Sequence, residues 1–226
     1  MELVVYETHE ATALGAAERI ADLINASDDG FTLGLAGGST CSMTYEALRH
    51  RDVGWDRVDA WLSDERWVPP DDERSNGRMA AETLMDHVAA RFHRPHWSEF
   101  IEAPDSAVHY EAQIRSIHDD KRPDLIILGM GEDGHTASLF PGSSAIDEAR
   151  NLFVATTIPE TGEERLTATY PLLWSAQRLL VMTTGESKAP AIRDAFQRSG
   201  VPIERIGDGE AEVEWHVDRA AASLLS

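Results

Sequence analysis

The sequence predicts an α/β fold in which a mostly parallel sheet is covered by helices on both faces. Two observations predict it. Short β-rich runs alternate with longer stretches of helical period, and this alternation is typical of parallel sheets. The β-rich runs are also almost continuously apolar, as strands buried on both sides should be. Because no composition shift marks a linker, we expect residues 1–226 to form a single domain.

The elements follow in chain order. The expected strands are LVVY, FTLGLA, VDAWLS, DLIILG, LFVATTI and RLLVMTT, at residues 3–6, 31–36, 58–63, 124–129, 152–158 and 178–184. Apolar residues at helical spacing predict helices between them, over residues 8–26, 76–92, 106–118 and 187–197. The last stretch, EVEWHVDRAAASLL, predicts an edge strand followed by a closing helix.

In such folds ligands bind beyond the carboxyl ends of the strands, and four strand ends carry polar clusters. The first cluster is Gly37, Gly38, Ser39 and Thr40. Its glycines let the backbone approach a ligand closely, and the free amides of a following helix favour a phosphate. The alternative is an ordinary tight turn in which Ser39 or Thr40 caps the helix. Cys41 comes next, and without an adjacent histidine we interpret it as a loop thiol.

The second cluster is Asp64, Glu65 and Arg66, directly after the expected strand 58–63. Charged side chains that leave a buried strand are costly unless they pair with each other or meet a ligand. A self-satisfied ion cluster on a loop is the plain interpretation. Beside a phosphate-binding loop, we favour contact with a ligand.

The third cluster follows strand 124–129 and carries Gly129, Gly131 and Gly134 in a GxGxxG pattern. This pattern usually suggests a dinucleotide, but a histidine and then a proline follow where the long receiving helix should begin. We therefore interpret the glycines as making room for Asp133 and His135. A histidine is the simplest general base near neutral pH, and a nearby carboxylate can orient it.

The fourth cluster places Lys188 in the expected first turn of a helix, where the helix dipole disfavours a cation and an anionic counterpart is needed. The plain alternative is an exposed lysine paired with Glu186. Arg165, expected just before a helix, is a second candidate cation. Neither residue is informative alone.

Composition excludes several classes of function. Forty acidic and 20 basic residues give a formal charge of −20 and a pI near 4.7, which argues against nucleic acids and anionic membranes as partners. The single cysteine fits a reducing compartment, and no leader or membrane-length apolar run is visible, so we expect a soluble cytoplasmic protein. His93 and His96 lack a third spaced ligand and no HExxH occurs, so no metal site is expected.

Five motifs, taken together, resemble the 6-phosphogluconolactonases, which share a superfamily with the glucosamine-6-phosphate isomerases. They are LAGGST, SDERWVPPDDERSN, LGMGEDGHTASLFPG, RLT and TGESKAPAI, and they occur in the family's order over nearly the whole chain. The resemblance implies a modified Rossmann-like fold with neither a metal nor an organic cofactor. It implies hydrolysis of 6-phospho-D-glucono-1,5-lactone to 6-phosphogluconate in the oxidative pentose phosphate pathway. The implied partner is this small sugar-phosphate lactone, and we expect a monomer or a weak homo-oligomer.

The resemblance also implies site residues. The substrate phosphate would be held by Gly37, Gly38, Ser39, Thr40, Arg165 and Lys188. The reacting end would be lined by Asp64, Glu65, Arg66, Asp133 and His135. Our hypothesis makes His135 the general base, Asp133 the residue that orients it and Arg66 the group that offsets negative charge.

Three other functions remain as alternatives. The isomerases of the superfamily place a glutamate five residues after the histidine, and Phe140 in that position cannot transfer a proton. A non-enzymatic sugar-phosphate sensor would call for a DNA-binding module, for which the chain shows neither a spare segment nor a basic face. An oxidoreductase rests only on the GxGxxG pattern.

Overall fold

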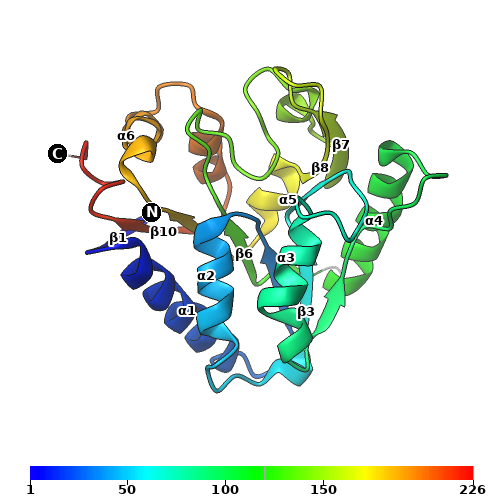
Figure 1. Cartoon of the computed structure of the whole chain (residues 1–226), viewed down its shortest axis with the longest axis horizontal. Helices are drawn as coiled ribbons and strands as arrows, with labels where there is room; N and C mark the ends of the chain where they lie inside the picture. Colours follow the sequence, from blue (N-terminus) through cyan, green and yellow to red (C-terminus); the bar gives the residue numbers. More distant parts are fainter. Residues whose placement is uncertain (120, 226) are drawn as a thin grey trace.

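The computed structural model describes residues 1–119 and 121–225, which form two sheets (Figure 1). The strands are β1 (Glu2–Tyr6), β2 (Phe31–Leu35), β3 (Val58–Leu62), β4 (Asp64–Arg66), β5 (Arg91–His93), β6 (Leu125–Leu128), β7 (Phe153–Thr157), β8 (Glu164–Ala168), β9 (Arg178–Thr183) and β10 (Glu212–Asp218). The α-helices are α1 (His9–Asn25), α2 (Ser39–Leu48), α3 (Asn76–Thr83), α4 (Ala103–His118), α5 (Tyr170–Ser175) and α6 (Ala189–Gln197). The 3-10 helices are η1 (Trp55–Arg57), η2 (Met85–His87), η3 (Ser144–Asp147), η4 (Glu186–Lys188) and η5 (Pro202–Asp208).

The larger sheet has seven strands in the order β1-β10-β9-β6-β2-β3-β5, and all of its strand pairs are parallel. The predicted α/β fold is therefore confirmed. The smaller sheet is antiparallel, with the order β4-β8-β7. It lies beside the carboxyl end of β3, because only Ser63 separates the end of β3 from the start of β4.

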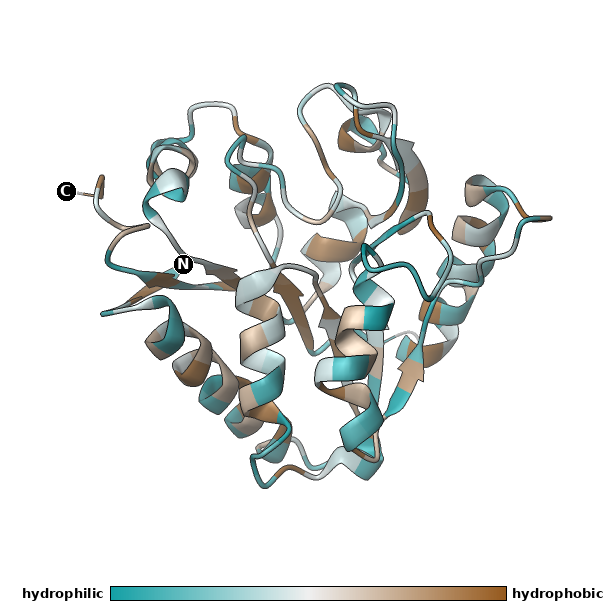
Figure 2. Ribbon diagram, viewed as in Figure 1, coloured by the Kyte–Doolittle hydropathy of each residue, from teal (hydrophilic) through white to brown (hydrophobic). Residues whose placement is uncertain are grey.

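Each face of the larger sheet has its own hydrophobic core, because successive strand residues point to opposite faces. In β6, Leu125 and Ile127 belong to the core that α1, α2 and α3 cover. Ile126 and Leu128 belong to the core that α4, α5 and α6 cover. Figure 2 shows the central strands as hydrophobic, whereas the helices alternate between hydrophilic and hydrophobic residues. Among the described residues, no helix has the length and apolar character needed to cross a membrane.

The prediction for residues 152–168 was partly wrong. The run LFVATTI does form a strand, β7, but β7 pairs with β8 in the smaller sheet and does not join the parallel sheet. A tight connection turns the chain back, with Gly162 at φ 71° in the left-handed region and the amide of Ile158 bonded to the carbonyl of Glu163 at 2.9 Å. Arg165 consequently lies within strand β8, and β8 leads into α5, so the residue does precede a helix as expected.

Two further expectations were wrong. The helix predicted over 76–92 ends at Thr83, because Leu84 leaves helical geometry with φ −137°. The chain then extends into β5, where Arg91 and His93 both contact Asp59 of β3.

The C-terminal strand β10 is an inner strand between β1 and β9, and the residues after it form turns in place of the expected closing helix. Local sequence does not fix strand order, so the edge position was not readable from the pattern.

Candidate active site

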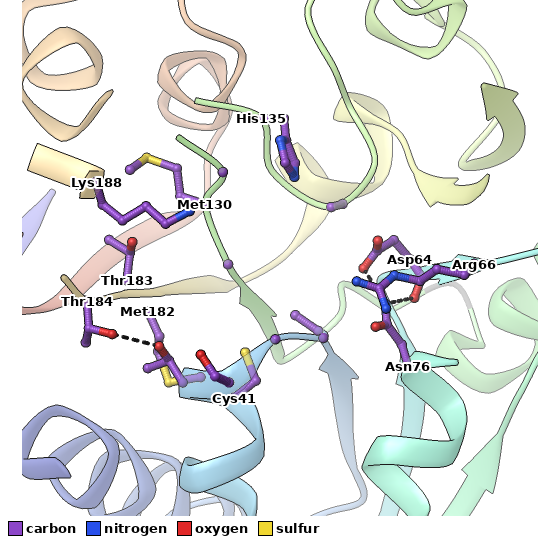
Figure 3. Close-up of a pocket in the computed structure, with 18 residues that line it drawn as sticks. Cys41, Asp64, Arg66, Asn76, Met130, His135, Met182, Thr183, Thr184 and Lys188 are labelled. Atoms are coloured by element: carbon purple, nitrogen blue, oxygen red, sulfur yellow. Dashed lines mark hydrogen bonds between the residues drawn. The ribbon is translucent and has the colours of Figure 1, made fainter. Parts of the chain in front are cut away.

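Four neighbouring strands, β9, β6, β2 and β3, bring their carboxyl ends to one edge of the larger sheet, where a cleft of about 270 Å³ opens. Eight of the residues predicted from sequence line this cleft: Gly37, Gly38, Ser39, Thr40, Asp64, Arg66, His135 and Lys188. In Figure 3, Lys188 and Thr184 lie on one side and Asp64, Arg66 and Asn76 on the other, with the His135 ring projecting between them.

The loop after β2 leads directly into α2. Gly38 is the N-cap residue at φ 106°, and no side chain caps the helix, so neither Ser39 nor Thr40 plays the capping role of the alternative interpretation. The first amides of α2 therefore remain available at the cleft, where the helix dipole favours an anion. A Cβ on Gly37 would lie 1.9 Å from Oδ1 of Asn76, so the close approach requires glycine.

The loop after β6 holds the imidazole of His135 by its Nδ1 edge. Asp133 Oδ1 lies 2.5 Å from His135 Nδ1 and also accepts the backbone N–H of His135 at 3.1 Å. A Cβ on Gly131 would lie 2.1 Å from His135 Nδ1, which shows the predicted space-making role of that glycine. The ring packs on Phe140 at a centroid distance of 4.2 Å. Because Nδ1 is occupied, Nε2 is the nitrogen that remains available.

The carboxylate of Asp133, in its ionised form, is suited to hold that imidazole. Partial burial raises the pKa of Asp133, but hydrogen bonds from the side chain and the backbone of His135 lower it, and the net shift is downward. A carboxylate in this position fixes the ring orientation and stabilises an imidazolium when one forms.

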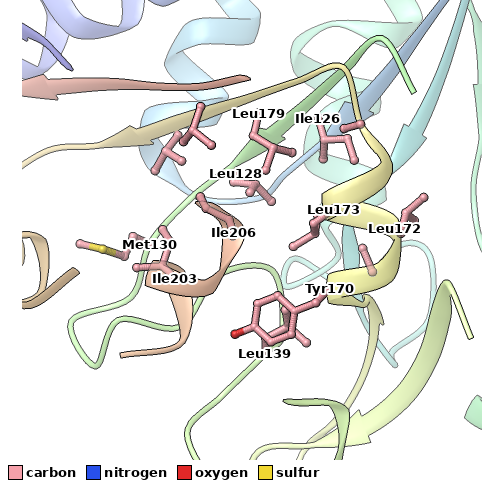
Figure 4. Close-up of a cluster of buried hydrophobic side chains, with 14 of the residues drawn as sticks. Ile126, Leu128, Met130, Leu139, Tyr170, Leu172, Leu173, Leu179, Ile203 and Ile206 are labelled. Carbon is pink, nitrogen blue, oxygen red and sulfur yellow. The ribbon is translucent and has the colours of Figure 1, made fainter. Parts of the chain in front are cut away.

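Residues beyond the histidine anchor the loop in the core, as Figure 4 shows for Leu139 beside Tyr170. Leu139 and Tyr170 are fully buried, and Thr136 donates a hydrogen bond to the carbonyl of Gly129 at 2.9 Å. No long helix follows the third glycine, in agreement with the interpretation of the GxGxxG pattern. The loop is thus a rigid support for His135.

The opposite wall is built by Asp64 and Arg66 with residues that the site prediction omitted. The carboxylate of Asp64 accepts hydrogen bonds from Asn76 Nδ2 at 3.1 Å and from Ser138 Oγ at 2.8 Å. Arg66 donates through Nη1 to the carbonyl of Arg74. Asn76 stands in the quoted motif DDERSN, and Ser138 in GHTASLFPG, so the motifs contained both residues without indicating their role.

Glu65 does not reach the cleft, contrary to its predicted place at the reacting end. Its Oε1 accepts the amides of Arg66 and Asn76 at 2.8 and 2.6 Å, and its Oε2 accepts Ser75 Oγ and the amide of Gly77 at 2.9 and 2.7 Å. Burial raises the pKa of Glu65, against the effect of these donors. Glu65 therefore anchors the N-terminus of α3, which positions Asn76.

Of the two candidate cations, only Lys188 lines the cleft. Lys188 ends η4 just before α6, and within residues 1–119 and 121–225 it forms no ion pair, neither with Glu186 nor with another carboxylate. Arg165 pairs with Glu163 at 2.7 Å and lies opposite Arg66 in the β4–β8 register. Arg165 lies outside the cleft because its side chain pairs with Glu163.

Cys41 lines the floor of the cleft but is only 1% exposed. Burial raises the pKa of its thiol to about 12, so the thiol is poorly suited to act as a nucleophile. The interpretation of Cys41 as a loop residue was wrong, because it lies in the first turn of α2. Across the part of the chain that the structure describes, no three His, Cys, Asp or Glu side chains are arranged to hold a metal ion.

Comparison with known proteins gives consistent matches. A family model described as glucosamine-6-phosphate isomerases/6-phosphogluconolactonase matches residues 7–215. A 6-phosphogluconolactonase from Haemophilus influenzae is 32% identical over 210 residues, which span 85% of this chain and 87% of the relative. A solved 6-phosphogluconolactonase from Trypanosoma brucei aligns with a TM-score of 0.86 at 25% identity, covering 100% of this chain and 98% of that one.

The same fold also occurs in a monomeric glucosamine-6-phosphate deaminase. That structure aligns with a TM-score of 0.84 at 24% identity and covers 99% of this chain and 100% of its own. At this identity the likeness concerns the fold alone. The fold is therefore common to two chemistries, and the residues of the cleft have to separate them.

Proposed function

The chain belongs to the glucosamine-6-phosphate isomerase/6-phosphogluconolactonase family, and from that premise we propose that it hydrolyses 6-phospho-D-glucono-1,5-lactone to 6-phosphogluconate. This reaction is a step of the oxidative pentose phosphate pathway. The observation that carries the proposal is that Asp133, which does not itself line the cleft, holds the ring of His135, which does. The other end of this cleft offers a helix N-terminus and Lys188.

The chemistry begins at the Nε2 atom of His135. The neutral imidazole removes a proton from a water molecule, and the oxygen of that water attacks the lactone carbonyl carbon. Negative charge develops on the carbonyl oxygen, and Arg66 offsets it. When the tetrahedral intermediate collapses, the bond to the ring oxygen breaks, and the imidazolium returns its proton to that oxygen. Asp133 keeps the ring oriented through both proton transfers.

Binding of the phosphate fixes the substrate for this attack. The backbone amides at Ser39 and Thr40 and the ammonium group of Lys188 supply the binding energy at the non-reacting end. Remote binding of this kind orders the reacting atoms and accelerates the reaction without taking part in the chemistry. The carboxylate of Asp64 is held in place by hydrogen bonds from Ser138 and Asn76. Its remaining lone pairs accept hydrogen bonds from hydroxyl groups of the sugar.

One position argues for the lactonase over the isomerase. Phe140 packs on the ring of His135 at 4.2 Å, where the isomerases of the superfamily carry a glutamate. A phenyl ring cannot relay the proton that opens an amino sugar. It does support the imidazole in the orientation that lactone hydrolysis requires.

The proposal extends to the setting of the enzyme. We infer that the chain works as a single domain in the cytoplasm, as a monomer or a weak homo-oligomer, with neither nucleic acid nor membrane as a partner. The acidic charge of −20 and the single cysteine support this setting.

The direct test is hydrolysis of freshly prepared 6-phosphogluconolactone, followed by the appearance of 6-phosphogluconate. We expect enzyme-dependent turnover after the spontaneous opening of the lactone is subtracted. Glucosamine 6-phosphate serves as the matched control substrate, on which no release of ammonia is expected. Release of ammonia without lactone hydrolysis would reverse the assignment within the family.

A further inference from the structure

A second cavity, of about 480 Å³, shares Arg66 with the active-site cleft. We call it the tryptophan cavity and define it by Trp67, Trp97, Phe92, Arg94, His96 and Arg66. Its walls come from the segment after β4 and from the segment that includes β5 and the residues beyond it. None of these residues except Arg66 has a part in the proposed hydrolysis.

Aromatic rings line this cavity without filling it. Trp67 and Trp97 are half-buried, with ring centroids 6.4 Å apart and planes inclined by 54°. Because the two rings are tilted and not stacked on each other, a planar guest could stack on the face of either ring that borders the cavity. Pro70 and Pro95 also line the cavity, and their fixed φ angles limit the freedom of its walls.

The charge of the cavity is opposite to that of the whole protein. Among the described residues, the guanidinium groups of Arg66 and Arg94 have no carboxylate partner, although the chain has 40 acidic residues. Arg94 instead lies over the Phe92 ring at 5.6 Å. The one carboxylate that lines the cavity is Glu65, and backbone amides and a serine hydroxyl already occupy both of its oxygens.

The two histidines of the cavity differ in availability. His93 is committed, because its Nε2 lies 2.8 Å from Asp59 Oδ1 and its Nδ1 lies 3.0 Å from Gln113 Nε2. His96 is exposed, and among the described residues its only hydrogen bond is made by its backbone carbonyl, which accepts from Ser106 Oγ at 2.7 Å. The imidazole of His96 can therefore meet a ligand beside Arg94.

We propose that the tryptophan cavity binds an anion that carries a planar aromatic ring, such as a nucleoside monophosphate. The ring stacks on Trp67 or Trp97, and the anionic group pairs with Arg94 and His96. Half-buried tryptophan rings line the same cavity as guanidinium groups that have no carboxylate partner among the described residues, and each is suited to one half of such a ligand. Because Arg66 borders both cavities, a ligand here would lie next to the reacting end of the cleft.

The test is calorimetric titration of the full chain with adenosine 5′-monophosphate, with no lactone present. We expect saturable binding to one site. Each of the two replacements Trp67→Leu and Arg94→Gln should weaken binding by at least about fivefold, since the first removes a ring on which the base stacks and the second removes a charge-assisted hydrogen bond. The matched control is Arg51→Gln, another exposed arginine, which should leave the affinity unchanged. Circular dichroism checks that the variants fold.

Three further titrations distinguish binding in the tryptophan cavity from binding in the active-site cleft. Adenosine and glucose 6-phosphate each lack one half of the ligand, so each should bind the cavity at least about fivefold more weakly. Lys188→Ala should leave the affinity for the nucleotide unchanged, because Lys188 lies in the other cleft. The proposal fails if no saturable binding occurs, if the Trp67 and Arg94 variants bind normally, or if Lys188→Ala abolishes binding. None of these results would affect the proposed lactonase activity, which is measured separately.

Discussion

At the scale of single residues, the proposed reaction gives two residues of the cleft different tasks. His135 transfers protons at the bond that breaks, whereas Lys188 binds the phosphate at the other end of the substrate. His135 is fixed by Asp133 on one ring nitrogen and by Phe140 on one ring face, which is the arrangement of a group that must transfer protons in a defined direction. Lys188 has a charge and a long flexible stem, which suits electrostatic binding of a phosphate. The two substitutions should therefore affect different kinetic constants.

Replacing His135→Ala should lower kcat by about 10²- to 10⁴-fold, the usual contribution of a positioned general base. The fold should survive, because Leu139 and Thr136 anchor the loop independently of the imidazole. Steady-state hydrolysis of the lactone measures the effect, with His109→Ala on the exposed face of α4 as the matched control. Wild-type turnover by a folded variant would remove His135 from the role of base.

Replacing Lys188→Ala should mainly raise KM, by roughly tenfold or more, because a charge-assisted hydrogen bond to phosphate contributes about 1.5–3 kcal/mol. The value of kcat should change little if binding and chemistry are separate. Lys121 is the only other lysine of the chain, so Lys121→Ala is a matched control for loss of one positive charge. An unchanged KM in the Lys188 variant would contradict the phosphate-binding role.

At the scale of elements, the sequence predicted what depends on local pattern. Buried strands such as β6 and β9 are continuous apolar runs, and the polar clusters at their ends were found because a buried strand makes such clusters conspicuous. The smaller sheet was not predicted, since β4 has only three residues and all three are charged. Without β4 and β8, the burial of Glu65 and the pairing of Arg165 with Glu163 outside the cleft could not be foreseen.

Helix α4 carries a buried titratable group at its end. His118 is 6% exposed and packs edge-on against Trp61 at a centroid distance of 5.6 Å. Its Nε2 atom has no hydrogen-bond partner among the described residues. Burial therefore lowers the pKa of His118 from 6.5 to about 4.

This shift predicts sensitivity of the fold to acid. The neutral ring is favoured in the folded state, so its contribution to stability is complete above pH 6.5 and is lost as the pH falls toward 4. Between pH 7.5 and pH 5 the loss should be on the order of 2 kcal/mol. The wild-type chain and His118→Leu should therefore differ in how urea unfolding depends on pH, with the variant less sensitive. A difference in unfolding free energy that stays constant across this range would show that His118 does not titrate in this way.

At the scale of the whole molecule, an anionic substrate must approach a protein that carries a formal charge of −20. The sequence establishes that imbalance, but it does not show where the few unpaired cations lie. The strand order solves this problem, because β9 and β3 flank β6 and β2 and so place Lys188 and Arg66 on opposite sides of one cleft. Salt screens the long-range repulsion between the substrate and the acidic surface. It weakens the direct contact between the substrate and the cations of the partly enclosed cleft much less, so the local attraction can prevail.

The same charge should make the stability of the fold depend on salt. Exposed pairs such as Arg219–Glu7, with both side chains about 70% exposed, are each worth only ~0–1 kcal/mol, whereas the unbalanced acidic charge repels itself over the whole surface. Screening should relieve more repulsion than it weakens attraction. We expect Tm to rise by roughly 2–4 °C between low salt and 0.5 M NaCl, because the relief of ~1 kcal/mol of repulsion shifts Tm by this amount for a chain of this size. Differential scanning calorimetry measures the shift, and a parallel series in sorbitol at matched osmolality controls for effects other than charge. A Tm that falls with NaCl would mean that the ion pairs outweigh the self-repulsion of the acidic surface.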